Sequence, residues 1–305
     1  MFIKNIIRKF ASLVASNINI SAKEDETTLL ALGSLLSKQQ YLLNSLNFND
    51  YGFKIFSQWD DDGLIQYIIK HINIENEVFI EFGVEDFTES NGRFLMMHNN
   101  WKGFVMDGSK QNMDRLLAKD WYWKYSLIRK NAFITKENIN GLLAETGFLN
   151  IGLLHIDLDG NDVHILAELN LKELNPSIII MEYNAVFGKE RAISVPYDKD
   201  FFRTNKHYTN LYWGASLPAT TYVANSKGYS LIGCNTAGNN AYYVRKDLLN
   251  ETIREKTIDE AFIMSKFRES RDKNFTLSYL DGDERYEMIK GLDVINVKTN
   301  EMEKL

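Results

Sequence analysis

Two neighbouring apolar segments in the middle of the chain end in side chains that can bind a metal ion or accept a proton. The first is followed by Asp157 and Asp159, and the second by Glu182 and Asn184. If both segments are parallel strands, their carboxyl ends meet at the sheet edge where α/β proteins bind ligands. The four oxygen donors could then hold a hard divalent ion such as Mg²⁺, and a bound ion acidifies a substrate hydroxyl. One of the carboxylates, or His207 later in the chain, could instead act as the general base, and helix capping is the structural alternative.

An earlier apolar segment ends in Glu81 and Gly83 and is expected to be a buried parallel strand followed by a sharp turn. A dinucleotide fingerprint, G-x-G-x-x-G, would have its second glycine where this chain has Glu85, and Phe87 further along the same turn is not a glycine either. The acids of this loop would repel the pyrophosphate that a helix N-terminus usually receives. S-adenosylmethionine (SAM), which is cationic and carries no phosphate, fits such a loop better. An ordinary turn with solvated acids is the alternative.

Other positions in the same half of the chain match the parts of an adenosyl cofactor. Asp107 lies 24 residues after Gly83, close to the spacing at which Rossmann-type sites bind the ribose hydroxyls. A third strand is expected to end near Asn131, beside the adenine, although a plain turn residue is the alternative. Ser57 and Gln58 could reach the methionine end of the cofactor. We therefore predict cofactor contacts from Ser57, Gln58, Glu81, Gly83, Asp107, Ser109, Asn131 and Ala132.

The composition is that of an ordinary globular protein, and it argues against some functions. Of the 305 residues, 45% are hydrophobic and 25% are charged, so a sizeable core is expected. The formal net charge of −6 argues against nucleic acid as the main partner, because phosphate binding needs a basic face. The single cysteine, Cys234, permits no intramolecular disulfide, and we predict a cytoplasmic location.

The last strands distinguish between two kinds of nucleotide-binding sheet. Residues 229–234 and 241–245 are separated by a short Gly/Asn-rich segment, so they should form a hairpin whose final strand runs antiparallel. Nicotinamide-binding domains keep these strands parallel, whereas a methyltransferase sheet ends in this way. We therefore predict an α/β, Rossmann-like sheet of seven strands that is parallel except for the last. Residues 195–217, which are rich in aromatic side chains, are expected to cover the pocket of the methyl acceptor.

The catalytic domain is expected to span residues 51–248, between two extensions. In residues 1–50, apolar residues at helical spacing predict two helices, used for packing or for self-association as a homo-oligomer. The first helix could also lie on an anionic membrane surface, but it is too short to span a bilayer. In residues 249–305 we expect a helix over 258–267 and a small strand over 294–297.

The ordered set of motifs resembles the FkbM-like SAM-dependent methyltransferases over roughly residues 53–245. The resemblance is carried by Phe56-Ser-Gln with Asp-Asp-Gly63, Phe79-Ile-Glu-Phe-Gly-Val84, Glu89-Ser-Asn91, Met106-Asp-Gly-Ser109, His155-Ile-Asp-Leu-Asp-Gly-Asn-Asp162 and Met181-Glu-Tyr-Asn184. It implies a class I methyltransferase fold, with Glu81, Gly83 and Asp107 at the cofactor, and O-methylation of a sugar or a similar hydroxyl. The metal hypothesis is similar to what macrocin-type sugar O-methyltransferases do with acids after the fourth and fifth strands.

The sequence thus predicts a SAM-dependent O-methyltransferase that acts on a hydroxyl of a sugar, glycan or glycosylated metabolite, with or without help from a divalent metal. Two alternatives belong to other classes. One is a noncatalytic SAM-binding scaffold that assembles through its N-terminal helices. The other is a nucleotide-sugar transferase that uses Asp157 and Asp159 as a metal–diphosphate motif.

Overall fold

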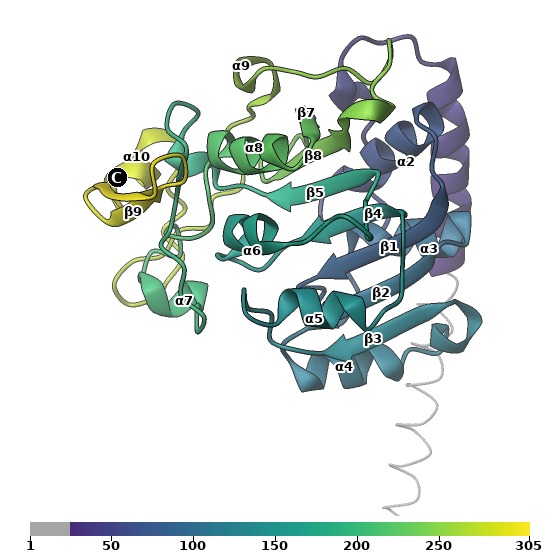
Figure 1. Ribbon diagram of the computed structural model, residues 1–305, viewed down its shortest axis with the longest axis horizontal. Coiled ribbons are helices and arrows are strands. Elements are labelled where there is room, and N and C mark those ends of the chain that lie inside the picture. The colour runs from purple at the N-terminus through teal and green to yellow at the C-terminus, as the bar shows by residue number, and fades with distance from the viewer. Residues whose placement is uncertain (1–24) are drawn as a thin grey trace, which may run out of the picture.

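The structure, a computed structural model, describes residues 25–305, and a seven-stranded sheet forms its centre (Figure 1). Its strands are β1 (Asn76–Phe82), β2 (Lys102–Asp107), β3 (Leu127–Asn131), β4 (Ile151–Ile156), β5 (Ile178–Glu182), β7 (Tyr229–Cys234) and β8 (Asn240–Arg245). They lie in the order β3-β2-β1-β4-β5-β8-β7. The pairs formed among β1 to β5 are all parallel, whereas β8 is antiparallel to both of its neighbours. The predicted sheet is therefore confirmed, and its topology is that of a Rossmann-like class I methyltransferase.

Helices cover both faces of this sheet and give the domain three layers. They are α2 (Asp61–His71), α3 (Asn91–Asn99), α4 (Lys110–Leu117), α5 (Ile139–Ala144), α6 (Asp162–Glu168) and α8 (Leu217–Ser226). Alternate strand residues point to opposite faces, so Ile80 and Phe82 enter one core and Phe79 enters the other. Residues of α5, α6 and α8 pack in the first core, and residues of α2, α3 and α4 pack in the second (Figure 1). Burial on both faces explains the continuous apolar runs of the central strands.

The N-terminal segment packs against the edge of the domain. Residues 25–39 are helical and continue into η1 (Gln40–Leu42), and Glu26 forms an ion pair with the buried Arg93 of α3. The first of the two predicted N-terminal helices lies outside the described residues. No helix within residues 25–305 combines the length and the apolar character needed to cross a bilayer. Large apolar side chains remain exposed on this segment and the turn after it: Leu32, Leu35, Tyr41, Leu42 and Leu46.

Short elements connect these layers and the C-terminal extension. They are η2 (Phe48–Tyr51), η3 (Tyr122–Lys124), η4 (Ala185–Phe187), α7 (Arg203–Lys206), η5 (Lys246–Leu248), α9 (Ile258–Ala261) and α10 (Gly282–Glu287). A second sheet of three strands consists of β6 (Ile193–Ser194), β9 (Asp293–Asn296) and β10 (Glu301–Lys304). The strand predicted over 294–297 is confirmed by β9.

The helix predicted over residues 258–267 is wrong in its length, because α9 ends at Ala261. Beyond that residue the chain is extended and bonded to the domain. The Tyr183 hydroxyl donates to the carbonyl of Ile263 (2.7 Å), and the N–H of Lys266 donates to the carbonyl of Ala237 (3.2 Å). These tertiary contacts override the local helical pattern.

Candidate functional site

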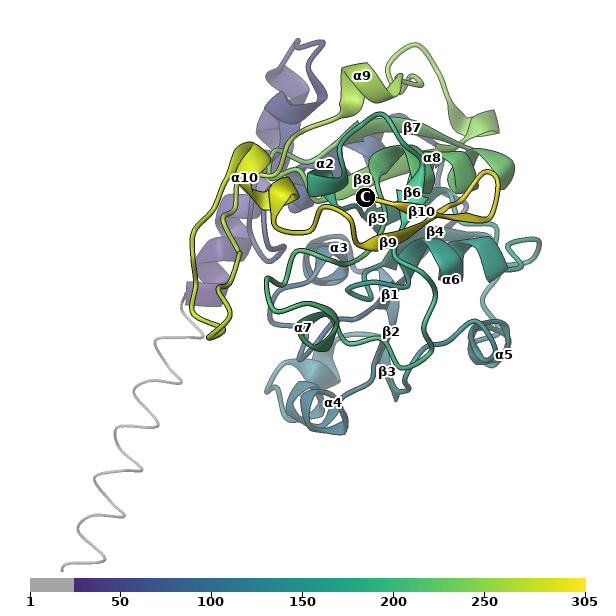
Figure 2. The same cartoon turned by 90° about the vertical axis from the view of Figure 1, so that its left-hand side faces the viewer.

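The carboxyl ends of the strands open into a single cavity of about 600 Å³. In Figure 1 the arrowheads of β1, β4 and β5 point toward the side of the molecule that carries α7, and Figure 2 looks onto that side. The lining comes from the turns after β1 to β4, from the end of β5, from the start of α7 and from the β7–β8 hairpin. This is the sheet edge at which ligands of α/β proteins bind.

The turn after β1 has a glycine-like backbone at three positions. Gly83 has a φ of 69°, and a Cβ there would lie 1.8 Å from the carbonyl oxygen of Asp157. Glu85 (φ 47°) and Phe87 (φ 62°) are also left-handed, a conformation that costs a non-glycine residue about 1 kcal/mol or more. Phe87 is fully buried and stacks on Phe79, which offsets this strain. Glu85 and Phe87 therefore keep a backbone conformation that glycine adopts more readily.

Glu81 lines the cavity, but protein groups use its hydrogen-bonding capacity. Its carboxylate accepts from the Ser90 hydroxyl (2.6 Å), from the N–H groups of Asn91 and Gly92 (both 2.9 Å) and from Nδ1 of His155 (2.9 Å). A carboxylate has about four acceptor sites, so these four donors saturate it. Burial alone would raise the pKa of Glu81, but the bonds, chiefly that from His155, lower it. The predicted cofactor residue thus fastens β1, β4 and the start of α3 together.

His155 lines the cavity and was missed in the sequence because it lies inside an apolar run. Burial opposes its positive charge, but the hydrogen bond and the charge of Glu81 outweigh burial and raise its pKa. Nε2 of His155 lies 3.3 Å from Nδ2 of Asn91. The signal that could have found it is its spacing from Asp157, since residues two apart on a strand share a face.

Asp107 ties the turn after β1 to the turn after β2. Its carboxylate accepts from the N–H of Glu85 (2.9 Å) and the N–H of Ser109 (2.7 Å). Asn131 donates from Nδ2 to the carbonyl of Asp107 (2.9 Å) and does not line the cavity. Asp107, Ser109 and Ala132 do line it.

Of the two residues predicted near the methionine end of a cofactor, Gln58 lines the cavity and Ser57 does not. The buried Ser57 hydroxyl lies 2.8 Å from the carbonyl of Trp59 and 3.0 Å from Oδ2 of Asp62, and its single proton is available to either acceptor. Burial raises the pKa of Asp62 to about 6. Ser57 therefore shapes the loop that carries Gln58.

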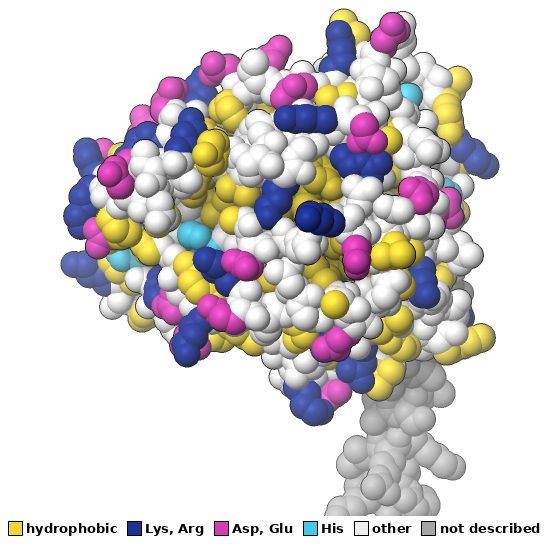
Figure 3. Space-filling model, viewed as in Figure 1, with side chains coloured by type: hydrophobic (Ala, Val, Ile, Leu, Met, Phe, Trp, Pro, Cys, Tyr) yellow, Lys and Arg dark blue, Asp and Glu magenta, His cyan; other side chains and the backbone are white. Residues whose placement is uncertain are grey.

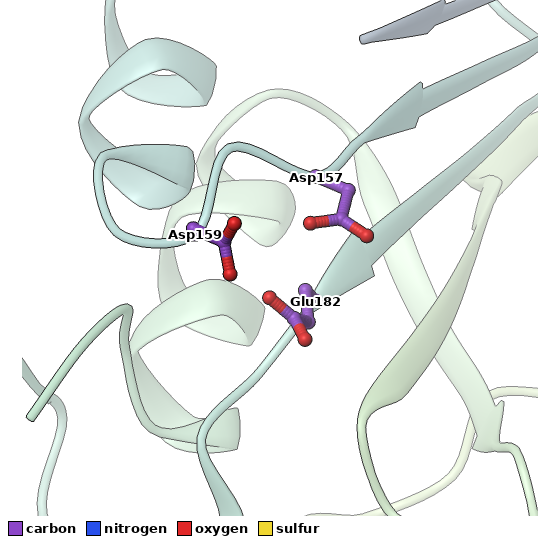
Figure 4. Close-up of side chains that lie close together, drawn as sticks. All are labelled: Asp157, Asp159 and Glu182. Carbon is purple, nitrogen blue, oxygen red and sulfur yellow. The ribbon is translucent and has the colours of Figure 1, made fainter. Parts of the chain in front are cut away.

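The structure brings the carboxylates of Asp157, Asp159 and Glu182 together (Figure 4). One oxygen of each lies within 4.8 Å of the others, because the β4–β5 register places Asp157 beside Glu182. Burial and the neighbouring acids raise the pKa of Asp157 to about 7 and that of Glu182 well above its usual value. Glu182 is 8% exposed, and its Oε2 is buried with no hydrogen-bond partner among the described residues. Acids clustered in this way require a cation or a proton.

The loop between β4 and α6 presents two of these acids. The buried carboxylate of Asp162 accepts from the N–H groups of Leu158 (2.7 Å) and Gly160 (3.0 Å) and so closes the loop. Between these two residues, Asp159 has a left-handed φ of 55°. Its carboxylate forms an ion pair with Arg203 (3.2 Å).

Asn184 and His207 lie elsewhere, so the structure corrects their predicted roles. Nδ2 of Asn184 donates to the carbonyls of Leu211 and Trp213 (both 2.9 Å), which fastens the segment after β5. Nδ1 of His207 lies 2.7 Å from the Thr209 hydroxyl, and His207 does not line the cavity. Neither side chain is placed to act as a ligand or a base in the cluster.

Aromatic and amide side chains complete the lining. Phe201 and Phe202 come from the segment that was expected to cover the pocket, and Phe202 stacks on Phe133 with ring centroids 5.8 Å apart. Phe133 and Phe202 are 43% and 57% exposed, so their rings form an open rim. The amides of the lining are Gln58, Asn91, Asn112, Asn161, Asn239 and Asn240.

The cavity is strongly acidic. Its basic side chains are Arg203 and His155, whereas its carboxylates are those of Glu81, Glu85, Glu89, Asp107, Asp157, Asp159 and Glu182. On the outer face shown in Figure 3, acidic and basic side chains are interspersed without a continuous basic field. Such a cavity favours a cationic or neutral ligand over a phosphorylated one.

No protein-family model matches this sequence, and no curated protein matches it significantly. Solved structures with some similarity include TrmK of M. capricolum with S-adenosyl-homocysteine (SAH), at 14% identity and a TM-score of 0.36 over 61% of this chain and 71% of that chain. The N-terminal domain of EvdMO1 with SAH and D-fucose has 10% identity and a TM-score of 0.40, covering 69% and 94%. An O-methyltransferase from Bacillus cereus with SAH has 10% identity and a TM-score of 0.39, covering 71% and 90%. Because these scores lie below 0.5, the fold assignment rests on the strand order and directions given above.

Proposed function

We propose that this protein is a SAM-dependent O-methyltransferase. The observation that carries the proposal is an acidic cavity at the carboxyl ends of a methyltransferase-type sheet. The turn after β1, which borders this cavity, has a left-handed backbone at Gly83, Glu85 and Phe87. The cofactor would supply a methyl group on a sulfonium centre, and the excess of carboxylates suits that positive charge. Asp107 and Ser109, which line the cavity, would hold its ribose, and Gln58 lines the same cavity from the loop before α2.

The acceptor we propose is a hydroxyl of a sugar, glycan or glycosylated metabolite. Carbohydrates are neutral, and they bind through hydrogen bonds to amides and through apolar ring faces. The lining offers both kinds of contact in Asn239, Asn240, Phe201 and Phe202. Nδ2 of Asn240 donates to Asp61 (2.9 Å), which fixes the amide, and its Oδ1 is buried without a partner among the described residues. A donor such as a hydroxyl group would satisfy that oxygen.

We propose further that Asp157, Asp159 and Glu182 can hold a divalent cation. The donor set fits, because hard cations prefer carboxylate oxygens. Three oxygens within 4.8 Å of one another lie no more than about 2.8 Å from a common centre, and an inward shift of less than about 1 Å would suit Mg²⁺ at about 2.1 Å. The orphaned Oε2 of Glu182 supports the same assignment. A bound cation would lower the pKa of an acceptor hydroxyl.

Asp157 is the residue we assign as proton acceptor. Without a bound cation its pKa of about 7 lies near the operating pH, which is where a general base works best. With a cation on the cluster, Asp157 would be a ligand, and the cation itself would lower the pKa of the acceptor hydroxyl. The buried Phe201, packed against Gly160, would exclude water from the reacting groups on its side of the cavity. Catalysis would then come chiefly from holding donor and acceptor in line.

The two alternatives make different demands on the cavity. A nucleotide-sugar transferase must hold a diphosphate, and Arg203 is already engaged by Asp159 and Glu269. A noncatalytic scaffold would bind SAM without transferring its methyl group.

We also propose self-association through the exposed leucines Leu35, Leu42 and Leu46, since exposed apolar patches mark interaction surfaces.

The proposal is tested by transfer of a labelled methyl group from SAM to a panel of sugars and glycans, in Mg²⁺ and in EDTA. Asp157→Asn and Glu182→Gln should lower turnover by about 100-fold or more and leave SAM affinity nearly unchanged. Asp200→Asn, an exposed acid on the aromatic segment, is the matched control and should be active. Full turnover in Asp157→Asn would show that Asp157 is not the proton acceptor. Full turnover in EDTA would show that the reaction needs no divalent cation.

A further inference from the structure

The C-terminal extension reaches the edge of the cavity through one acidic side chain. Glu269 lies in the extended segment after α9, and its carboxylate accepts from Nη2 of Arg203 (3.1 Å) and Nδ2 of Asn210 (2.5 Å). Arg203 lines the cavity, whereas Glu269 does not. Glu269 is therefore one contact away from the proposed site.

The segment that carries Glu269 is well anchored. The buried Arg285 donates to the carbonyls of Ser265 (2.8 Å) and Phe267 (3.1 Å). The ring of Phe267 stacks on Trp59 with centroids 6.2 Å apart. Glu269 is thus held in place by the extension and by the loop before α2.

The guanidinium of Arg203 is fixed by its surroundings. Nε donates to the carbonyl of Asn210 (3.0 Å), Nη2 faces Glu269, and Nη1 faces Asp159 (3.2 Å). The group lies 4.5 Å from the ring centroid of Trp213, and the side chain is 14% exposed. The guanidinium is planar, and its N–H donors are fixed relative to one another. The position of Glu269 therefore helps to set the position of Asp159 through Arg203.

Asp159 depends on this contact more than its neighbours do. Its side chain is 64% exposed, whereas Glu182 is buried by the sheet. A carboxylate that is exposed on a loop loses side-chain freedom when it binds a ligand, unless a partner already holds it.

We propose that Glu269 is a positioning residue that acts through Arg203 on Asp159 and thereby sets the affinity of the acid cluster for a divalent cation. The inference rests on the metal-assisted function proposed above. Glu269 neutralises part of the positive charge of Arg203. The guanidinium therefore binds Asp159 less strongly and does not displace a cation from it. Without Glu269, Nη2 of Arg203 loses its partner, so the guanidinium no longer orients Asp159 and its undivided positive charge competes with a cation for that carboxylate. Outer-shell partners of metal ligands typically change affinity by about 10- to 100-fold.

The test is a double-mutant cycle on the full chain, with Mn²⁺ affinity measured by electron paramagnetic resonance and SAM affinity by calorimetry. The proteins are wild type, Glu269→Ala, Arg203→Met and the double variant. Glu255→Ala removes an exposed acid from the same extension and is the control. If Glu269→Ala is unstable, Glu269→Gln removes the charge and keeps the shape.

Glu269→Ala should weaken Mn²⁺ binding about 10-fold and leave SAM affinity unchanged. When Arg203 is already replaced by Met, Glu269→Ala should not weaken Mn²⁺ binding further, because the effects of two residues that act through each other do not add. An equal loss in both backgrounds, or no loss at all, overturns the inference. If wild type binds SAM but no Mn²⁺, the cation part of the proposed function falls and this inference with it; if wild type binds no SAM, the methyltransferase proposal itself fails.

Discussion

Replacing Asp157 by asparagine should stabilise the metal-free protein at alkaline pH while it removes activity. Burial raises the pKa of Asp157 from 3.8 to about 7, so the folded state retains a proton that the unfolded state loses. The unfolding free energy of the wild type therefore falls as the pH rises from about 4 to about 7 and stays low above that range. Asparagine cannot ionise, and the variant is free of this loss.

The size of the effect follows from the pKa. The interval between 3.8 and about 7 corresponds to about 4 kcal/mol, at about 1.4 kcal/mol per pH unit. This is an upper limit, because Glu182 titrates together with Asp157 and because Asp157 keeps some solvent contact. We expect the variant to gain about 2 kcal/mol at pH 8 in EDTA, or several degrees of unfolding temperature, and nothing at pH 4.

Thermal and urea unfolding in EDTA at several pH values measures this gain, with Asp200→Asn as the exposed control. Mg²⁺ should reverse the order by stabilising the wild type, because a ligand of the folded state adds to its stability and the variant lacks one ligand. A variant that is less stable than wild type by the same amount at every pH would refute the reasoning. Asp157 would then be a hydrogen-bonding residue and not a buried charge.

Four further changes test other parts of the structure. Gly83→Ala should cost about 3 kcal/mol or more in urea unfolding and abolish SAM binding, because its Cβ would collide with backbone. Gly141→Ala, in helix α5 with open space around it, should instead stabilise the protein by up to about 1 kcal/mol, and equal effects would contradict the turn geometry. Glu85→Gly should stabilise the protein by about 1 kcal/mol and keep SAM affinity, and a loss of stability would show that the left-handed backbone is not a strain. Phe133→Ala should weaken SAM binding about 5-fold in calorimetry with little change in stability, because Phe133 follows the predicted cofactor contact Ala132 and its ring is half exposed on the rim of the cavity. Unchanged affinity would show that this ring does not contact the cofactor. Leu46→Glu should lower the molar mass measured by light scattering to that of a monomer, because it places a charge among the exposed leucines. If the wild type is already a monomer, the proposed self-association is wrong.

The fold could be predicted from the sequence because its signals are local. The β4 and β5 segments are apolar runs bounded by polar turns, and the Gly/Asn-rich separation before β8 sets the antiparallel hairpin. Asp157 and Glu182 could be predicted to meet, since each directly follows or ends a strand and the strands are parallel neighbours.

The remaining site residues depend on contacts that no local pattern encodes. Asn184 lies two residues beyond Glu182, but the chain turns into η4 there, so strand alternation no longer applies. The hydrogen-bond partners of Glu81 come from α3 and β4. Glu81, which was expected to contact the cofactor, therefore holds these elements together instead. Glu269 meets Arg203 across 66 residues of sequence, which only the folded chain reveals.

The central claim is that the acidic cavity holds a cationic adenosyl cofactor and not a phosphorylated one. Calorimetric titration of the full chain with SAM, NAD and a nucleotide sugar, each with and without Mg²⁺, tests it most directly. We predict that SAM binds with a Kd in the micromolar range and that NAD and the nucleotide sugar do not bind. Binding of either diphosphate together with no binding of SAM would contradict the claim.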